Sequence, residues 1–368
     1  VAAVWWHLDP DKALWITVSV LVVTCPCALS LATPVALTVA SGALARIGLL
    51  VTRGHAVEAL ARTTHFVFDK TGTLTCGQMR LIETRTLGAL PEDECLRLAA
   101  ALEQSSEHPV GRALRAASTG DLAATAAVVS VPGCGLASGD GAAEVRVGRP
   151  EWVAELHGRP LDEETSAWLD CGDTVVALGN AQGWLALFRI GDEIRPDAAD
   201  LVTALKAAGC AVTLLTGDAP TIARRVGAQL RIDDVRAGMS PAGKHGYVKH
   251  LQERGATVAM VGDGVNDAPV LAQAHVSIAM GGGATLARTQ ADLVLLSEDL
   301  DHLRRGLLLS RRAMKVIRQN LIWSFVYNFV ALPLAMFGFI TPWMAGIGMS
   351  GSSLLVVLNS LRLQRSEA

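Results

Sequence analysis

Residues 66–75 read Phe66-Val67-Phe68-Asp69-Lys70-Thr71-Gly72-Thr73-Leu74-Thr75. The first three residues are apolar and favour a β-strand, and a carboxylate and a turn rich in hydroxyl groups follow directly. A buried strand of a parallel sheet delivers a side chain in this way to the carboxyl edge of the sheet, where open α/β folds bind ligands. The stretch therefore predicts an α/β domain with Asp69 as a nucleophile at that edge.

The composition indicates a multidomain protein that is partly embedded in lipid. A chain of 368 residues favours two or more domains, and 51% hydrophobic with only 18% charged residues is unusual for a purely soluble protein. A net charge of −3 gives no argument for nucleic acid binding. The seven cysteines form neither a zinc knuckle nor a disulfide framework. Because the first residue is Val1 and no basic leader follows, we expect a cut inside a longer protein rather than a signal peptide.

Two long stretches without charge predict membrane spans. The first lies between Lys12 and Arg46 and exceeds the roughly 20 residues that a span requires. The second, 319–361, suits two spans joined near Thr341-Pro342. Arginines follow the first stretch and precede the second, so both of these ends are expected in the cytosol.

The first stretch contains Cys25-Pro26-Cys27. Pro26 removes a backbone donor and is expected to unwind the helix, which frees carbonyl groups in the middle of the membrane. Two thiols beside such a break are soft ligands for Cu(I) or Zn(II). The alternative is two small thiols that only pack against neighbouring helices.

After Trp184 the pattern alternates between strand and helix, which predicts a doubly wound parallel sheet. The expected strands are 186–190, 210–215, 257–261 and 275–279, and the expected helices are 197–208, 221–230 and 244–254. Two of the strands run into turns that carry carboxylates: Thr216-Gly217-Asp218 and Gly262-Asp263-Gly264-Val265-Asn266-Asp267. Each of these turns is common by itself. Three of them, counting the turn after Asp69, each directly after an expected strand, form a much more specific pattern.

The motif Asp-Lys-Thr-Gly-Thr-Leu-Thr from Asp69 resembles the phosphorylation motif of the P-type ATPases. With Cys-Pro-Cys inside an upstream span, the chain is similar to the heavy-metal (class IB) branch of that family. The resemblance implies a haloacid-dehalogenase-like phosphorylation domain, an inserted α+β nucleotide-binding domain and α-helical spans. The expected domains are membrane residues 1–50, phosphorylation domain 51–75 and 186–300, nucleotide domain 76–185, and two C-terminal spans within 301–368. The tail of one span is expected at the start of the first segment.

The resemblance also implies the roles of the catalytic residues. Asp69 would take the γ-phosphoryl group of ATP, with Mg²⁺ held by Asp69, Thr71, Asp263 and Asp267. The other expected catalytic residues hold or surround the phosphoryl group: Lys70, Thr71, Thr216, Gly217, Asp218, Lys244 and Asn266.

The family's Ser-Glu-His-Pro motif is present at residues 106–109 and implies that Glu103, His108, Gly133 and Gly135 line the adenosine site. Taken alone, His108 before a proline is a helix-end histidine, and a Gly-x-Gly pattern is weak. Where the family often has Gly-Asn, this chain has Gly148-Arg149, so a nucleotide contact at Arg149 is not carried over.

In the family, a Tyr-Asn pair and a Met-x-x-Ser-Ser pattern accompany Cys-Pro-Cys in Cu(I) pumps. This implies a transported-ion site made of Cys25, Cys27, Tyr327, Asn328, Met349 and Ser353. Zinc-type pumps carry a Lys and an Asp in these spans, and residues 319–361 contain neither. For Met349 the alternative is helix packing among small residues.

Three functions remain open at this stage: Cu(I) export, export of Zn, Cd or Pb, and the activity of a soluble haloacid-dehalogenase-like phosphatase. Such phosphatases carry a second Asp two residues after the nucleophile, where this chain has Thr71. Without that base an aspartyl phosphate should live longer, as a pump requires. We expect a monomer in the inner (plasma) membrane of a bacterium, with cytoplasmic catalytic domains, copper delivered by a cytosolic chaperone and no nucleic acid partner. The actuator motif Thr-Gly-Glu and a Cys-x-x-Cys metal-binding module are expected upstream of Val1.

Overall fold

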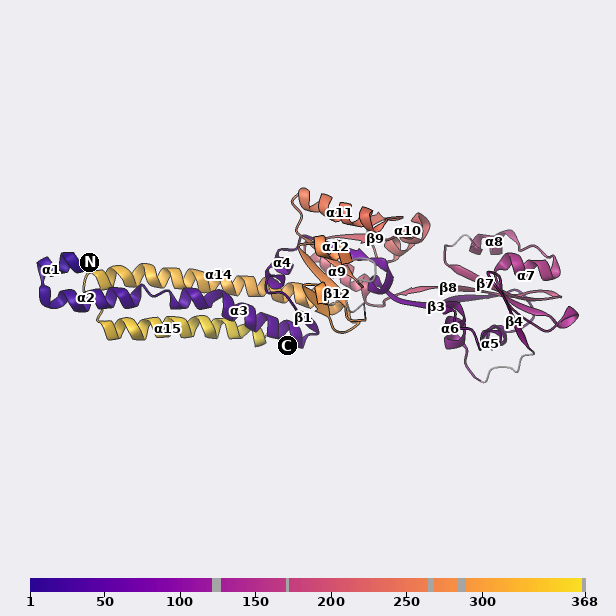
Figure 1. Ribbon diagram of the computed structural model, residues 1–368, viewed down its shortest axis with the longest axis horizontal. Coiled ribbons are helices and arrows are strands. Elements are labelled where there is room, and N and C mark those ends of the chain that lie inside the picture. The colour runs from indigo at the N-terminus through magenta and orange to yellow at the C-terminus, as the bar shows by residue number, and fades with distance from the viewer. Residues whose placement is uncertain (121–126, 170–171, 264–267, 283–288, 366–368) are drawn as a thin grey trace. The chain divides into compact units, whose positions relative to one another are not determined.

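The computed structural model describes residues 1–120, 127–169, 172–263, 268–282 and 289–365 (Figure 1). The chain divides into two compact units. The first contains residues 1–67, 203–211 and 245–368, and the second contains 68–202 and 212–244. The expected boundaries of the four functional segments stay predictions.

The first unit contains a group of helices that pack along one another: α1 (Ala2–Leu8), α2 (Pro10–Val23), α3 (Cys27–Arg46), α14 (Asp301–Met336) and α15 (Pro342–Leu361) (Figure 1). Small residues four apart on α3, Ala28, Ala32, Ala36 and Ala40, are buried and let neighbouring helices approach closely. Large apolar side chains such as Phe325 and Phe329 on α14 stay exposed, as expected of a surface that faces lipid.

Two stretches of the described residues are helical, long and apolar enough to cross a membrane: Pro10–Arg46 and Pro342–Gln364. The other predicted C-terminal span, the second half of α14, does not reach the same hydropathy, and polar residues such as Gln319, Asn320 and Asn328 dilute it. Asn320 is buried and donates to the Ser360 hydroxyl of α15 at 3.0 Å. A hydrogen bond between helices accounts for a polar residue there.

The predicted break at Pro26 is confirmed. Helix α2 ends at Val23 and α3 begins at Cys27, so Thr24, Cys25 and Pro26 interrupt an otherwise continuous apolar stretch. The break follows from the missing amide hydrogen of proline and the clash of its ring with the preceding turn.

A seven-stranded sheet has the order β1-β13-β12-β11-β2-β9-β10. Its strands are β1 (Leu49–Val51), β2 (His65–Asp69), β9 (Ala211–Leu215), β10 (Asp234–Arg236), β11 (Val258–Gly262), β12 (Val276–Met280) and β13 (Leu293–Leu295). The helices between them are α4 (Ala56–Arg62), α9 (Ala198–Ala207), α10 (Pro220–Gln229), α11 (Pro241–Glu253) and α12 (Ala268–Gln273). The haloacid-dehalogenase-like fold class is confirmed, with one departure: the edge strand β1 pairs antiparallel with β13.

A six-stranded antiparallel sheet in the second unit has the order β3-β8-β7-β6-β5-β4. It comprises β3 (Thr75–Thr86), β4 (Val128–Val131), β5 (Gly135–Ser138), β6 (Val145–Gly148), β7 (Thr174–Asn180) and β8 (Gly183–Ile194). The accompanying helices are α5 (Glu92–Leu102), α6 (Pro109–Ala117), α7 (Pro150–His157) and α8 (Glu163–Leu169). Leu102, Leu114, Leu178 and Phe188 are fully buried in the core between sheet and helices.

One strand was predicted for the wrong sheet. Residues 186–190 were expected in the parallel sheet, but they belong to β8, which pairs antiparallel with β3 and β7. An apolar run identifies a strand, yet the choice of sheet depends on distant partners that a local pattern does not contain.

Candidate active site and metal-binding helices

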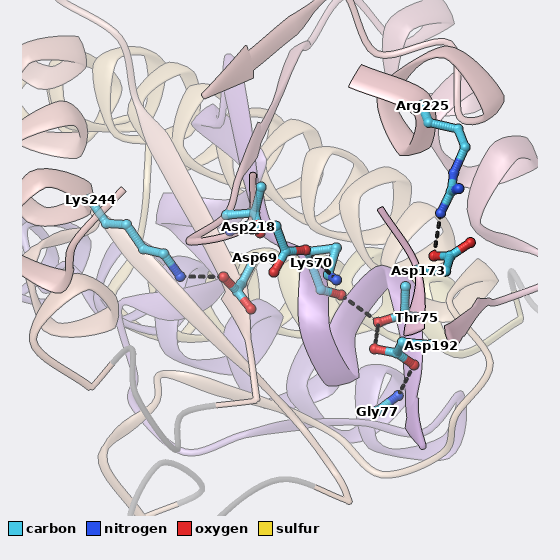
Figure 2. Close-up of polar contacts among 10 residues, drawn as sticks. Asp69, Lys70, Thr75, Gly77, Asp173, Asp192, Asp218, Arg225 and Lys244 are labelled. Atoms are coloured by element: carbon cyan, nitrogen blue, oxygen red, sulfur yellow. Dashed lines mark hydrogen bonds and ion pairs between the residues drawn. The ribbon is translucent and has the colours of Figure 1, made fainter. Parts of the chain in front are cut away.

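Asp69 is the last residue of β2, and its side chain is buried at the end of the strand. The Phe66, Val67 and Phe68 side chains before it have no exposure, so the strand is anchored on both faces up to the carboxylate. The ammonium group of Lys244, from the first turns of α11, donates a hydrogen bond to Asp69 Oδ1 (Figure 2). Both side chains are more than nine-tenths buried, so this ion pair is shielded from water.

A second ion pair joins Lys70 to Asp218, which follows β9 (Figure 2). The backbone N–H of Asp218 donates to the Thr216 hydroxyl at 3.1 Å, so Thr216-Gly217-Asp218 forms a tight turn around a buried hydroxyl. The ends of β2 and β9 thus carry two ion pairs, Asp69–Lys244 and Lys70–Asp218, and the turn that begins at Thr216. Such a group of charged and polar residues at strand ends is expected of a phosphate site.

The residues after Asp69 form a tight turn, Lys70–Leu74, in which Gly72 has a φ of +68°. Glycine suits this left-handed conformation because it has no Cβ. The Thr73 hydroxyl is fully buried and has no hydrogen-bond partner within the described residues. Since a buried polar group usually has a partner, this hydroxyl fits a ligand at the turn.

Arg195 is a functional candidate that the sequence analysis missed. It is buried, and its Nε donates to the Thr73 carbonyl at 3.0 Å, while its backbone N–H donates to the Leu74 carbonyl at 2.9 Å. Arg195 therefore holds the turn in place although it lies 122 residues downstream of Thr73 in the sequence. The only local signal was a charged residue before Pro196, which is not specific.

The first residues of β3 contact the end of β8 through Asp192 (Figure 2). Its carboxyl group accepts from the Gly77 N–H at 2.8 Å and from the Thr75 hydroxyl. Burial raises the pKa of Asp192, against the hydrogen bonds from Thr75 and Gly77, which lower it. Thr75 and Asp192 thus fix the exit of the turn.

The predicted magnesium residues are placed only in part. Asp263 follows β11 and is half-buried, and β11 is the neighbour of β2 in the sheet order. Thr71 is exposed in the turn after Asp69. Asn266 and Asp267 lie outside the described residues. Carboxylates at the ends of strands suit Mg²⁺, which prefers oxygen ligands. The assignment stays a prediction.

The predicted adenosine residues line one cavity of about 420 Å³ in the second unit. Glu103, His108, Gly133 and Gly135 all contribute to its wall, although they come from the α5–α6 connection and the β4–β5 turn. Gly133 has a φ of +77°, and a Cβ at Gly135 would lie 2.1 Å from the Val147 carbonyl oxygen. Glycine is therefore required at both positions for different reasons: backbone conformation at Gly133 and close strand approach at Gly135.

The connection from Glu103 to His108 is organised by hydrogen bonds. Arg115 of α6 donates to the carbonyl groups of Glu103 and Ser106, and sequence reasoning did not identify this arginine. Nδ1 of His108 accepts from the Val110 N–H at 3.3 Å, so His108 caps helix α6. This fixes the proton of a neutral ring on Nε2, which leaves an N–H donor for a ligand. His108 is thus a helix cap that also lines the cavity.

The two thiols of the predicted metal site lie at the helix break. The sulfur atoms of Cys25 and Cys27 are 2.7 Å apart, and both cysteines are free. Val23, just before the break, shares a buried apolar cluster with Ala345 of α15, and Ala28, just after it, shares another with Val356. The break is therefore level with the part of α15 that carries Met349 and Ser353.

The other predicted metal residues lie on the same group of helices. The Tyr327 hydroxyl of α14 approaches Gly348, next to Met349: a Cβ at Gly348 would be 2.8 Å from it. Asn328 and Ser353 are half-buried on α14 and α15. In the part of the chain that the structure describes, no group of three or more His, Cys, Asp or Glu side chains could hold a metal ion. Met349 is a neutral thioether, a soft ligand outside that set of residue types, and it could complement the two thiols.

Comparison with known proteins identifies the class first. Residues 63–275 match the haloacid dehalogenase-like hydrolases, and the chain belongs to that family. The chain is 41% identical to the "Cation-transporting P-type ATPase B" of Mycobacterium tuberculosis, over 96% of this chain and 48% of that protein. It is also 41% identical to the "Probable copper-exporting P-type ATPase V" of Mycobacterium tuberculosis, over 97% of this chain and 47% of that protein.

Among solved structures, the chain resembles a zinc-transporting PIB-type ATPase in the E2.Pi state. The TM-score is 0.85 at 33% identity, over 93% of this chain and 57% of that chain. Within the hydrolase family the chain is thus a heavy-metal P-type ATPase sequence. It spans about half the length of the curated relatives it matches.

Proposed function

We propose that the native protein exports Cu(I) across the inner membrane of a bacterium and is driven by ATP through an aspartyl phosphate on Asp69. The observation that carries the catalytic part is the buried Asp69–Lys244 ion pair at the end of β2. A carboxylate held at a strand end is positioned as a nucleophile, and the ammonium group can neutralise phosphoryl oxygens as they arrive.

The proposed chemistry has two steps. An Asp69 oxygen attacks the γ-phosphorus of ATP, a new P–O bond forms, and the bond to the β–γ bridging oxygen breaks, so that ADP leaves with the electron pair. Water later attacks the acyl phosphate, which restores the carboxylate and releases inorganic phosphate. Bound Mg²⁺ would supply charge neutralisation, held by Asp69, Thr71, Asp263 and Asp267. Thr71 stands where the related phosphatases have a base, which favours a pump over a phosphatase.

Copper is proposed from the ligands at the membrane break. Two thiols and a thioether at the same level form a soft, low-charge set that suits Cu(I) better than Zn(II). Relatives named as copper exporters support this choice. A zinc transporter is the alternative, because one of the solved structures that the chain resembles is a zinc-transporting ATPase. Delivery by a cytosolic chaperone and a monomeric state belong to the same proposal.

The metal preference tests this proposal. ATP hydrolysis by the native protein would be measured with Cu(I), Zn(II) and Cd(II), each buffered at a controlled free concentration. We expect stimulation by Cu(I), because the thiol and thioether set binds it preferentially. Stimulation by Zn(II) or Cd(II) but not by Cu(I) would contradict the copper assignment and leave a heavy-metal pump of another specificity.

We predict that His108→Gln weakens ATP binding by about tenfold, the loss expected for one hydrogen bond from a pocket residue. Phosphorylation by a small donor such as acetyl phosphate or inorganic phosphate should stay nearly intact, because His108 lines the cavity and not the turn at Asp69. Titration with ATP and labelling with acetyl phosphate measure the two effects. His157→Gln is the control, since His157 packs on Trp184. Loss of both activities in His108→Gln would place this residue at the phosphorylation site.

A further inference from the structure

Arg149 lines the same cavity as Glu103 and His108, although the sequence departs from the family pattern at this position. It follows β6 and precedes Pro150, the first residue of α7. Its side chain is exposed, so it borders the opening of the cavity and not its base. Position alone makes it a candidate contact for any ligand that enters.

The backbone of Arg149 is fixed against the β4–β5 turn. Its N–H donates to the Cys134 carbonyl at 2.8 Å. A Cβ at the preceding Gly148 would lie 2.3 Å from the same oxygen, so glycine permits this close approach. The guanidinium group is therefore carried on a rigid support beside Gly133 and Gly135.

Several other arginines of this domain are engaged with the protein itself. Arg115 donates to two carbonyl groups, Arg146 pairs with Glu144, and Arg189 pairs with Glu83. In contrast, no carboxylate among the described residues pairs with Arg149. A planar group with five donors is thus available to an anionic ligand.

The charges of the wall suggest how a ligand is oriented. Glu103 is buried in the wall and can accept hydrogen bonds from amino groups. Among the described residues that line the cavity, Arg149 alone carries a permanent positive charge. A nucleoside polyphosphate has this polarity, with an uncharged base that bears an amino group and a chain of negative phosphates. The base would lie toward Glu103 and the phosphates toward Arg149.

We infer that Arg149 is a specificity-determining residue of the nucleotide site, whose guanidinium group binds the phosphate chain of ATP. The inference rests on the proposed ATP binding in this cavity. The positive charge of Arg149 would raise the affinity of the site for nucleoside di- and triphosphates relative to nucleosides, which carry no phosphate. It also makes ATP binding sensitive to salt, because the contact is exposed.

The test is titration of the full chain with adenosine, AMP, ADP and ATP at low and moderate salt. In Arg149→Met, ATP and ADP binding should weaken by about tenfold, the cost of losing a charge-assisted hydrogen bond, while adenosine binding stays within about twofold. The dependence of ATP binding on salt should become less steep. Arg149→Lys should recover part of the ATP affinity, since it restores the charge but not the planar fork.

Arg159→Met is the matched control, because Arg159 is exposed just beyond the other end of α7 and does not line the cavity. It removes the same charge from the domain and should leave all four titrations unchanged. Equal losses for adenosine and ATP in Arg149→Met would overturn the inference and indicate stacking on the base. Unchanged ATP binding would also overturn it. Failure of the proposed function is distinguishable, because the unaltered chain would then bind neither adenosine nor ATP.

Discussion

Asp69→Asn is expected to abolish labelling of the protein by γ-labelled ATP, with a fall of at least about three orders of magnitude, as when other enzymes lose their nucleophile. The amide is a poor nucleophile, so no acyl phosphate forms. The fold should remain, because asparagine has nearly the same volume and can still accept from Lys244. The measurement is label that survives acid and is released by hydroxylamine, as expected of an acyl phosphate.

Asp200→Asn provides the matched control for this experiment. Asp200 is an exposed carboxylate in the first turn of α9, and its conversion to an amide removes the same charge without touching the turn after Asp69. Labelling should continue at the normal level. If label persists in Asp69→Asn, the nucleophile lies elsewhere and the aspartyl-phosphate proposal is wrong.

The strand that carries Asp69 could be predicted because its causes are local. Three apolar residues favour a buried strand, and the glycine and hydroxyl groups that follow favour a turn. The structure confirms this: β2 is buried and ends at Asp69 itself. The break at Pro26 was predictable for the same reason, since a missing amide hydrogen acts within one turn of helix.

The remaining features depend on contacts between distant residues. Arg195 fixes the turn at Thr73, and Arg115 organises the connection at Glu103, but nothing beside either arginine in the sequence indicates its partner. Arg149 reaches the cavity because β5 and β6 pair through two glycines, Gly135 opposite Gly148. Register of this kind is set by the whole sheet. The replacement of the family's Asn by Arg149 could therefore not be interpreted from the sequence alone, because the sequence does not show that this residue lines the cavity.

The proposed transported-ion site depends on both local sequence and contacts between distant residues. Local sequence places two thiols at a proline break. The apolar clusters that Val23 shares with Ala345 and Ala28 shares with Val356 bring that break level with Met349. An interrupted helix in a membrane is stable only where its free backbone groups line a site or find other partners. Soft ligands at such a break are therefore more consistent with metal binding than with packing alone.

Cys25→Ser and Cys27→Ser should each abolish copper-stimulated phosphorylation of the native protein by ATP. A hydroxyl is a hard, neutral group that does not replace a thiolate on Cu(I). The loss should exceed the roughly 10–100-fold cost of changing an outer-shell partner of a metal ligand. Met349→Leu should weaken the stimulation more mildly, because it keeps the volume and removes only the sulfur.

Three measurements separate a lost ligand from a damaged fold. ATP binding to the cavity of the second unit should be unchanged in both serine variants, since Glu103 and His108 lie far along the chain from the break. Thr24→Ser, beside Cys25 in the same break, should keep full stimulation, because its hydroxyl can still donate to the Leu21 carbonyl. Equilibrium binding of Cu(I), competed with a chelator of known affinity, should fall in the cysteine variants and not in Thr24→Ser. Unchanged copper binding in Cys25→Ser and Cys27→Ser would show that the thiols only pack between helices, and the ion site would have to be sought elsewhere.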